Sequence, residues 1–319
     1  MKKIALLATG GTIASVPSHQ GLVPGLTAQG IIDACQLNAI YEILPIDVFS
    51  MDSSNIQPEE WCQLAKEVKK ALALCDGVVI THGTDTMAYS AAALSYLLYG
   101  LTKPVIFTGS QLPLLAPLSD APSNLHHACA VAAQQVPGVY VVFHHKIIDG
   151  TRAVKTRTTS FNAFDSINAP LAGTIDSSGI HFDHPQQMQY DQNIVPVSDL
   201  DSRVFLLKVF PGTMPDIFDW IIHAKYKGVV LEAFGLGGLH YIRRNLVDKL
   251  KDLENHGIPV LVVTQCYYEK ADLTIYEVGN QLLSKNIISG GDLTTEAAVT
   301  KMMWALAQKD PLPYLLASS

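Results

Sequence analysis

The chain has 319 residues, of which 48% are hydrophobic and 16% are charged, and its formal net charge is −7. This length suits two domains of ordinary size, and the balance of apolar and charged residues excludes a disordered chain. The negative charge, without a visible basic stripe, argues against nucleic acid as the main partner.

The five cysteines are odd in number, and no two of them have C-x-x-C spacing. A disulfide framework and a zinc site are therefore not expected, and free thiols in a reducing compartment are the simplest interpretation. The apolar run Ile4–Ala8 is shorter than the roughly 7–15 residues of a signal-peptide core. It is also far too short for a membrane span. We therefore expect a cytoplasmic chain that does not bind membranes.

Short apolar runs alternate with helical patterns along the first half of the chain. The expected strands are Lys3–Thr9, Ile46–Phe49, Gly77–Thr81, Pro104–Thr108 and Gly138–Phe143. The expected helices are Pro58–Leu74, Thr86–Tyr99 and Asn124–Ala133. Such alternation predicts a mainly parallel sheet with helices on both faces. Ligands of such sheets bind beyond the carboxyl ends of the strands.

The polar segment 185–202 contains two prolines and is predicted to be a linker. Strands at Val204–Val209, Gly228–Leu231 and Pro259–Thr264, and helices at Asp216–Ala224, Arg243–Asn255 and Thr295–Ala307, are expected after it. The prediction is an α/β fold of two domains. A larger N-terminal domain (1–184) has a mainly parallel sheet flanked by helices, and a smaller C-terminal domain (203–319) has a parallel sheet.

A glycine pair, Gly10-Gly11, follows the first expected strand and precedes Thr12. Paired glycines allow positive φ and a close approach of backbone to a ligand. A dinucleotide-binding loop would need a third glycine near Ser15, and no phosphate-binding Gly-Lys-Ser/Thr is present. A plain structural turn and a ligand-binding turn therefore remain equally open on this motif alone.

The run His82-Gly83-Thr84-Asp85 lies at another junction between a strand and a helix. Thr84 or Asp85 could simply cap the helix, although capping does not explain the whole run. Lys155 would ordinarily be a surface lysine. If it lay beside Thr84 and Asp85, it could accept a proton, but the sequence alone does not place it there.

The loop Asp52-Ser53-Ser54 offers small hydroxyls beside backbone N–H groups, which suit a carboxylate ligand. A helix-start loop is an equally good interpretation of these residues. The histidines show no metal-binding spacing, so neither a metal nor another cofactor is expected.

Together these motifs resemble the bacterial-type asparaginase family. The resemblance is carried by Leu7–Ala14 and by Gly77–Met87, and it extends over essentially the whole chain. Further matching segments are Met51–Ser54, Pro104–Gln111, Phe161–Asp165, Thr264–Cys266 and Gly290–Ala297. The Met-Asp-Ser-Ser segment is similar to the cytoplasmic, type I branch. The resemblance implies hydrolysis of L-asparagine to L-aspartate and ammonia, with glutaminase activity as a minor possibility.

The resemblance also implies a role for each matching residue. Thr12 would be the nucleophile that forms an acyl-threonine ester, and Lys155 would hold and deprotonate Thr84. Asp85 and the loop Asp52-Ser53-Ser54 would bind the α-amino and α-carboxylate groups of the substrate. The family also implies a homodimer or a homotetramer built as a dimer of dimers.

One departure from the family pattern lies after the first motif, where Leu22 stands in place of a tyrosine that many relatives carry. Tyr276, from a segment that resembles an inter-subunit contact, is the candidate substitute. Asp272 is a candidate substrate-binding residue from a neighbouring subunit. Two rival interpretations are the amidase component of a tRNA-dependent amidotransferase and an inactive ligand-binding protein. The amidase component has an extra N-terminal domain, whereas this sequence starts at the first strand.

Overall fold

The computed structural model describes residues 1–18, 21–184, 197–275 and 286–317. The chain divides into two compact units, Met1–Val195 and Pro196–Ser319. Most of the predicted linker lies outside the described residues, so the linker and the exact domain borders stay predictions. Within the described residues, no helix is both long and apolar enough to cross a bilayer.

The first unit contains an eight-stranded sheet in the order β12-β11-β8-β7-β6-β5-β1-β4. Its strands are β1 (Lys3–Gly10), β4 (Glu42–Met51), β5 (Gly77–Thr81), β6 (Pro104–Thr108), β7 (Gly138–Phe143), β8 (Lys146–Asp149), β11 (Gly173–Asp176) and β12 (Gly179–Phe182). Strands β7, β6, β5, β1 and β4 run parallel to one another. The pairs β7–β8, β8–β11 and β11–β12 are antiparallel. The predicted mainly parallel sheet is confirmed.

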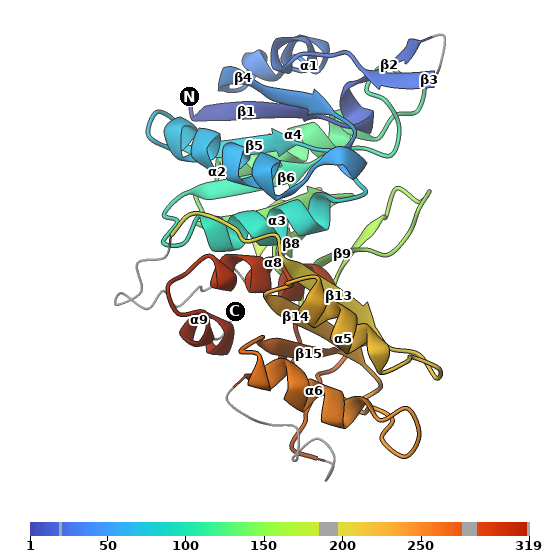
Figure 1. Cartoon of the computed structure of the whole chain (residues 1–319). Coiled ribbons are helices and arrows are strands. Elements are labelled where there is room, and N and C mark those ends of the chain that lie inside the picture. The colour runs from blue at the N-terminus through green and yellow to red at the C-terminus, as the bar shows by residue number, and fades with distance from the viewer. Residues whose placement is uncertain (19–20, 185–196, 276–285, 318–319) are drawn as a thin grey trace. The chain divides into compact units, whose positions relative to one another are not determined.

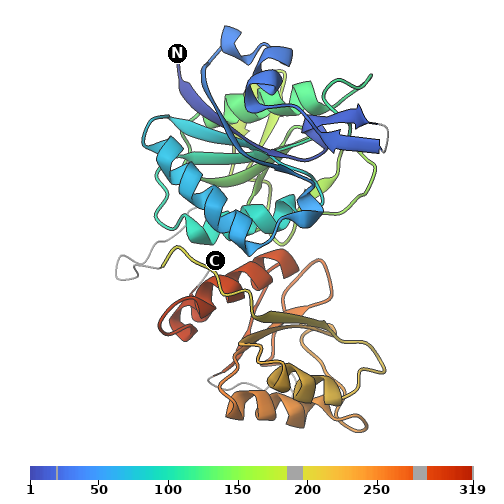
Figure 2. The same ribbon diagram turned by 45° about the horizontal axis from the view of Figure 1, so that its top comes forward.

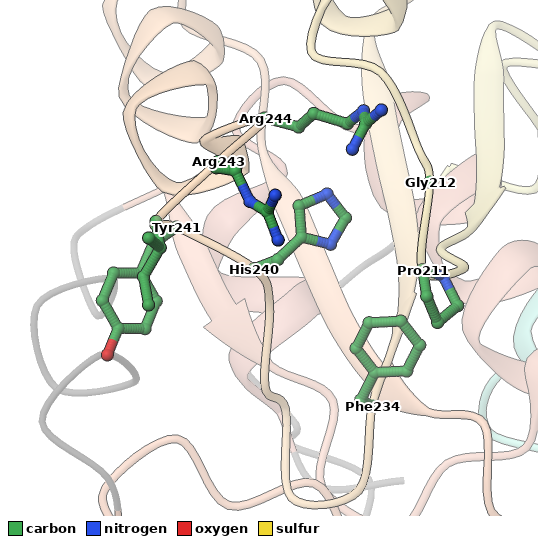
Figure 3. A pocket seen from close by; sticks show the side chains of 8 residues that line it. Pro211, Gly212, Phe234, His240, Tyr241, Arg243 and Arg244 are labelled. Atoms are coloured by element: carbon green, nitrogen blue, oxygen red, sulfur yellow. The ribbon is translucent and has the colours of Figure 1, made fainter.

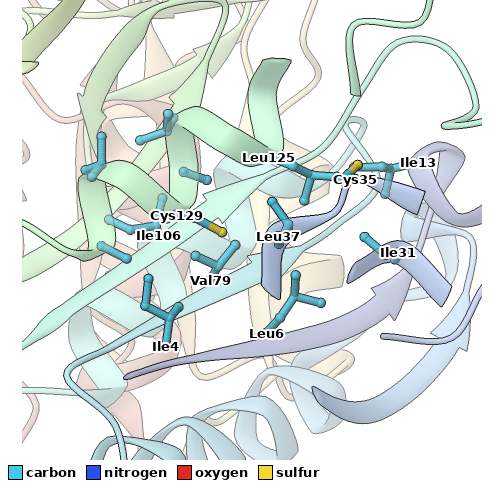
Figure 4. Close-up of a cluster of buried hydrophobic side chains, with 14 of the residues drawn as sticks. Ile4, Leu6, Ile13, Ile31, Cys35, Leu37, Val79, Ile106, Leu125 and Cys129 are labelled. Carbon is cyan, nitrogen blue, oxygen red and sulfur yellow. The ribbon is translucent and has the colours of Figure 1, made fainter. Parts of the chain in front are cut away.

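Helices cover both faces of this sheet (Figures 1 and 2). They are α1 (Ala28–Ala34), α2 (Pro58–Leu72), α3 (Met87–Leu97) and α4 (Ala121–Ala132). Helices α1 and α4 share one core with the sheet, in which Ile4 and Leu6 of β1 pack with Ile31, Leu125 and Cys129 (Figure 4). Helices α2 and α3 contact each other on the opposite face. Two small hairpins complete the unit: β2 (Ser15–Ser18) with β3 (Gly21–Pro24), and β9 (Ala153–Lys155) with β10 (Phe164–Ser166).

The second unit has a four-stranded parallel sheet in the order β13-β14-β15-β16. Its elements are β13 (Val204–Lys208), α5 (Asp216–His223), β14 (Gly228–Ala233), α6 (Leu246–Asn255), β15 (Val260–Thr264), β16 (Ile287–Ser289), α8 (Thr295–Leu306) and α9 (Leu312–Leu316). Phe218 of α5 and Leu250 of α6 pack on Val229 and Leu231 of β14. The predicted smaller parallel-sheet unit is confirmed.

Two predicted helix starts are wrong. The helix expected at Asn124 begins at Ala121, because Pro122 occupies the first turn, where its missing N–H is no loss. The helix expected at Arg243 begins at Leu246, because Arg244 has φ 51°, outside the helical region. The Asn245 side chain accepts hydrogen bonds from the Val247 and Asp248 amides and caps that helix.

Candidate active site

Four loops meet at the carboxyl edge of the larger sheet. They follow β1, β4, β5 and β6, which are neighbouring parallel strands. After β1 the chain passes to β4 on one side, whereas after β5 it passes to β6 on the other side. Ligands of open α/β sheets bind at such a reversal. Thr12 follows β1 and Thr84 follows β5, so the two threonines flank this position.

The loop after β1 turns sharply at two glycines. Gly10 and Gly11 have φ 96° and 77°, values that side chains with a Cβ rarely adopt. The Gly11 amide donates to the Met51 carbonyl over 3.0 Å, which joins this loop to the end of β4. A short 3₁₀ helix, Thr12–Ala14, follows directly. Within the described residues, the Thr12 hydroxyl has no hydrogen-bond partner.

Three of these loops touch through glycine. A Cβ on Gly11 would lie 2.3 Å from the Gly83 nitrogen, and a Cβ on Gly83 would lie 2.5 Å from the Ser53 Oγ. Only residues without side chains allow these approaches. The glycines thus bring the loops of Thr12, Ser53 and Thr84 together without intervening side chains.

A Gly11→Ala substitution is expected to destabilise the protein strongly. It combines an unfavourable positive φ, about 1–2 kcal/mol, with a backbone clash, and we expect a total loss of about 3 kcal/mol or more. Gly100→Ala is the matched control, because Gly100 has φ 82° and nothing within 4 Å of its Cβ position. Urea unfolding measures both variants. Equal losses of unfolding free energy in the two variants would show that the backbone at Gly83 can move to accommodate a Cβ on Gly11.

A lysine joins the loop after β5 to the β9–β10 hairpin. The Lys155 Nζ donates to the Thr84 Oγ1 over 2.8 Å and to the Asp85 Oδ1 over 2.7 Å. Thr84 is buried, and the Lys155 side chain is only 17% exposed, whereas that of Asp85 is 62% exposed. The structure therefore brings Thr84, Asp85 and Lys155 into one contact group, with the carboxylate facing outward.

The hairpin that carries Lys155 is held by a cluster around Asp165. The Asp165 carboxylate accepts from Lys146, Thr156 and Arg157, at 2.6–2.7 Å. These donors hold the pKa of Asp165 well below its usual range, although burial opposes them. Phe164 pairs with Lys155 across the hairpin, so this cluster fixes the strand opposite the lysine.

Gln111, in the loop after β6, was not predicted as a site residue. The Thr84 hydroxyl donates to the Gln111 Oε1 over 3.3 Å. The Gln111 Nε2 donates to the carbonyls of Thr158 and Ser160, which orients the amide oxygen toward Thr84. Its position after a parallel strand at the same edge was the available sequence signal.

His82, which the sequence analysis placed in the run before Thr84 but gave no role of its own, is fully buried. Its Nδ1 lies 2.7 Å from the Gly83 carbonyl and its Nε2 lies 2.9 Å from the Ser90 Oγ. Since a carbonyl only accepts, Nδ1 carries the proton and Nε2 accepts from Ser90. The Trp61 indole N–H donates to the same hydroxyl. This chain orients the peptide that precedes Thr84.

Burial lowers the pKa of His82 from 6.5 to about 4, although the bond to the Gly83 carbonyl raises it in part. Between pH 4 and pH 6.5, His82 is protonated in the unfolded chain but not in the folded chain. Stability is therefore expected to fall by about 3 kcal/mol as pH drops from 6.5 to 4. Urea unfolding across this range, compared with His82→Gln, isolates the effect. An identical pH slope in both proteins would contradict it.

The loop after β4 forms a 3₁₀ helix, Ser53–Asn55. The Asp52 carboxylate accepts from the Ser54 amide over 2.7 Å, and the Ser53 carbonyl accepts from the Thr86 hydroxyl over 2.7 Å. Ser53 is buried, while Asp52 and Ser54 are exposed. Asp52 thus caps this short 3₁₀ helix, whereas Gln57 caps α2, so neither Ser54 nor Asn55 starts the helix at Pro58 as the alternative interpretation expected.

Two predicted site residues, Asp272 and Tyr276, come later in the sequence than these loops. Asp272 belongs to the second unit, where Thr274 and Lys270 donate to it and lower its pKa to about 2. Tyr276 lies outside the described residues. Leu22 lies in β3, opposite Pro17 of β2.

Comparison with known proteins gives a consistent result. Residues 3–188 match the family profile described as "Asparaginase, N-terminal", and residues 203–313 match "Glutaminase/Asparaginase C-terminal domain". An L-asparaginase from Thermococcus kodakarensis is 38% identical over 95% of this chain and 92% of that protein. One component of the glutamyl-tRNA(Gln) amidotransferase of Pyrococcus furiosus is 36% identical over 97% of this chain and 73% of that component.

Solved structures agree with these sequence matches. The thermostable L-asparaginase from Thermococcus kodakarensis superposes with a TM-score of 0.88 at 38% identity, covering 98% of this chain and 95% of that one. The structure named "Probable Cytoplasmic L-asparaginase from Campylobacter jejuni" gives a TM-score of 0.85 at 28% identity and covers both chains completely.

Proposed function

The chain belongs to the asparaginase family, and on that premise we propose that it is an amidohydrolase that converts L-asparagine to L-aspartate and ammonia. One observation supports this proposal above the others: the Lys155 Nζ bonds both Thr84 and Asp85 at the strand edge where Gly11 approaches Gly83. The edge thereby combines two hydroxyls, an amine and a carboxylate, which together suit acyl transfer.

In the first step, Thr12 attacks the side-chain amide carbon. A bond forms from the Thr12 Oγ1 to carbon, the C–N bond breaks, and the hydroxyl proton leaves with the ammonia. An acyl-threonine ester remains, which divides one difficult hydrolysis into two easier steps. The Thr84 amide is the proposed donor to the developing oxyanion. Tyr276 is the proposed acceptor of the Thr12 proton.

In the second step, water replaces Thr12. Thr84 takes a proton from the attacking water and passes its own hydroxyl proton to the Lys155 Nζ, which has given a proton to the departing ammonia. The bond between water oxygen and carbon forms as the ester bond breaks, and the remaining water proton passes to the Thr12 oxygen, which leaves aspartate and ammonium as the products. The 2.8 Å contact of Lys155 with Thr84 supports this proton path.

Charged groups around the edge would bind the zwitterionic end of the substrate. Asp85 suits the α-ammonium group, because its carboxylate is exposed beside Thr84. The exposed Asp52 and Ser54 flank the buried Ser53, which lies against Gly83. Asp272 is proposed as a contribution from a neighbouring subunit. Such binding positions the amide for attack.

The decisive experiment incubates the purified chain with free L-asparagine and measures ammonia and aspartate. Equal amounts of both products are expected, without a metal or an added protein. L-glutamine is the comparison substrate, and its turnover is expected to be the slower of the two. No ammonia from either amino acid would refute the proposal.

A second candidate function follows from the 36% identity with the glutamyl-tRNA(Gln) amidotransferase component. In that case the amide cleavage would supply ammonia to a partner protein that holds a charged tRNA. Free asparagine would then be a poor substrate without the partner and the tRNA, so the same assay separates the two functions. The net charge of −7 disfavours direct binding of tRNA by this chain.

We further propose a cytoplasmic homodimer or homotetramer. The name of the Campylobacter jejuni structure supports the location. Light scattering should give two or four times the chain mass of 34.6 kDa. A mass equal to that of one chain would rule out the assembly and, with it, a role for Asp272 of a neighbour.

A further inference from the structure

A surface pocket of about 340 Å³ lies in the second unit, in a part of the chain that the proposed reaction does not use. Pro211 and Gly212 follow β13, and Phe234 follows β14. These strands are parallel neighbours, so the pocket lies beyond their carboxyl ends, where α/β sheets place ligands. The volume falls in the usual range for small-molecule sites.

The two ends of this pocket differ in chemistry. Figure 3 shows His240, Arg243 and Arg244 gathered at one end, with the rings of Phe234 and Pro211 at the other. None of the residues described as lining the pocket is acidic. A ligand with an anionic head and an apolar body matches this division.

The two arginines are available to a ligand. In the described part of the chain, neither forms an ion pair with a carboxylate. Arg244 donates from Nε to the Met214 sulfur over 3.3 Å, a weak acceptor, which leaves its terminal nitrogens for another partner. Arginine presents planar donors that match carboxylate and phosphate oxygens in pairs.

The loop that carries these arginines is fixed at both ends. The Leu246 amide donates to the His240 carbonyl over 3.1 Å and closes the loop at the start of α6. The His240 Nε2 donates to the Thr213 carbonyl over 3.1 Å, which fixes the orientation of the ring. Arg244 adopts φ 51°, an uncommon conformation for a long side chain. Such outliers occur often at ligand sites.

We propose that this pocket binds a small organic oxyanion, a phosphate monoester or a carboxylate, whose apolar body packs on Phe234 and Pro211. The Arg243 and Arg244 guanidinium groups bind the head group, and the His240 ring lies beside them. All of its lining residues belong to the second unit, and none of them has a role in the proposed reaction.

Isothermal titration of the full chain with phenyl phosphate and with benzoate tests this proposal. Saturable binding of at least one probe is expected, and the tighter one identifies the head group. Arg243→Gln and Arg244→Gln should each weaken binding by about 10-fold or more, since a hydrogen bond to a charged group is lost. Lys251→Gln removes one positive charge from α6 outside the pocket and should leave the affinity unchanged.

Two further probes test the two ends separately. Benzylammonium carries a similar body with the opposite charge and should not bind. Inorganic phosphate lacks the body and should bind more weakly than phenyl phosphate. The proposal is overturned if neither aromatic anion binds at about 10 mM, a concentration well above an ordinary weak dissociation constant. It is also overturned if the double arginine variant, folded by circular dichroism, binds as the wild type does.

Discussion

Thr12→Ala is expected to lower the rate of ammonia release from L-asparagine by about 10⁴-fold or more, since loss of a nucleophile removes the covalent route. The KM should change much less, because Asp85 and the Ser53 loop, the groups proposed to bind the substrate, are retained. Steady-state kinetics measure both constants. A residual rate within about 10-fold of the wild type would exclude Thr12 as the nucleophile.

Thr12→Ser is the matched control for this variant, because it keeps the hydroxyl and removes only a methyl group. It should retain a measurable fraction of the activity and form an ester that mass spectrometry detects on the peptide containing residue 12. Tyr276→Phe, measured in the same assay, tests the proton acceptor proposed for Thr12. Unchanged turnover in that variant would dismiss Tyr276.

The two threonines occupy different environments. The Thr84 hydroxyl is held between the Lys155 ammonium and the Gln111 amide oxygen. The Thr12 hydroxyl has no such partner among the described residues. A hydroxyl fixed beside an amine is suited to moving protons, whereas a hydroxyl that is free to rotate can approach a substrate carbon. This contrast supports the assignment of Thr12 to attack and Thr84 to the water step.

The parallel strands were predictable because each is a short apolar run ended by a turn. Strands Gly77–Thr81, Pro104–Thr108 and Gly138–Phe143 begin and end where predicted. Helices cover both faces of a parallel sheet, so its strands are apolar at every position, and such a continuous apolar run is visible in the sequence. The antiparallel strands β8, β11 and β12 were missed, since each has only four residues, and β11 and β12 are only partly buried.

The site was predictable only where it lies at a strand end. Thr12 and Thr84 follow strands, so the fold alone directs them to the sheet edge. Lys155 lies 71 residues from Thr84, and no local pattern encodes that contact. His82 contacts Ser90 in the following helix, and Ser90 in turn accepts from Trp61, 29 residues before it. Gln111 donates to the carbonyls of Thr158 and Ser160, 47 and 49 residues away. Tertiary packing alone brings such groups together.

Lys155→Met is expected to lower kcat by about 10²- to 10⁴-fold, which is the usual contribution of a positioned proton acceptor. Methionine preserves much of the side-chain volume but has no amine to bond Thr84 and Asp85. If Lys155 serves the water step, the acyl-threonine ester should accumulate in this variant. Rapid quenching of the reaction, followed by mass spectrometry, measures that ester.

Lys155→Arg separates proton transfer from charge. Arginine keeps a cation near Asp85, whose side chain is 62% exposed, but it does not lose its proton at ordinary pH. The proposed mechanism therefore requires Lys155→Arg to be nearly as slow as Lys155→Met, with substrate binding better preserved. Recovery of most of the turnover in Lys155→Arg would mean that the charge, and not the proton path through Thr84, is what the reaction needs from this residue.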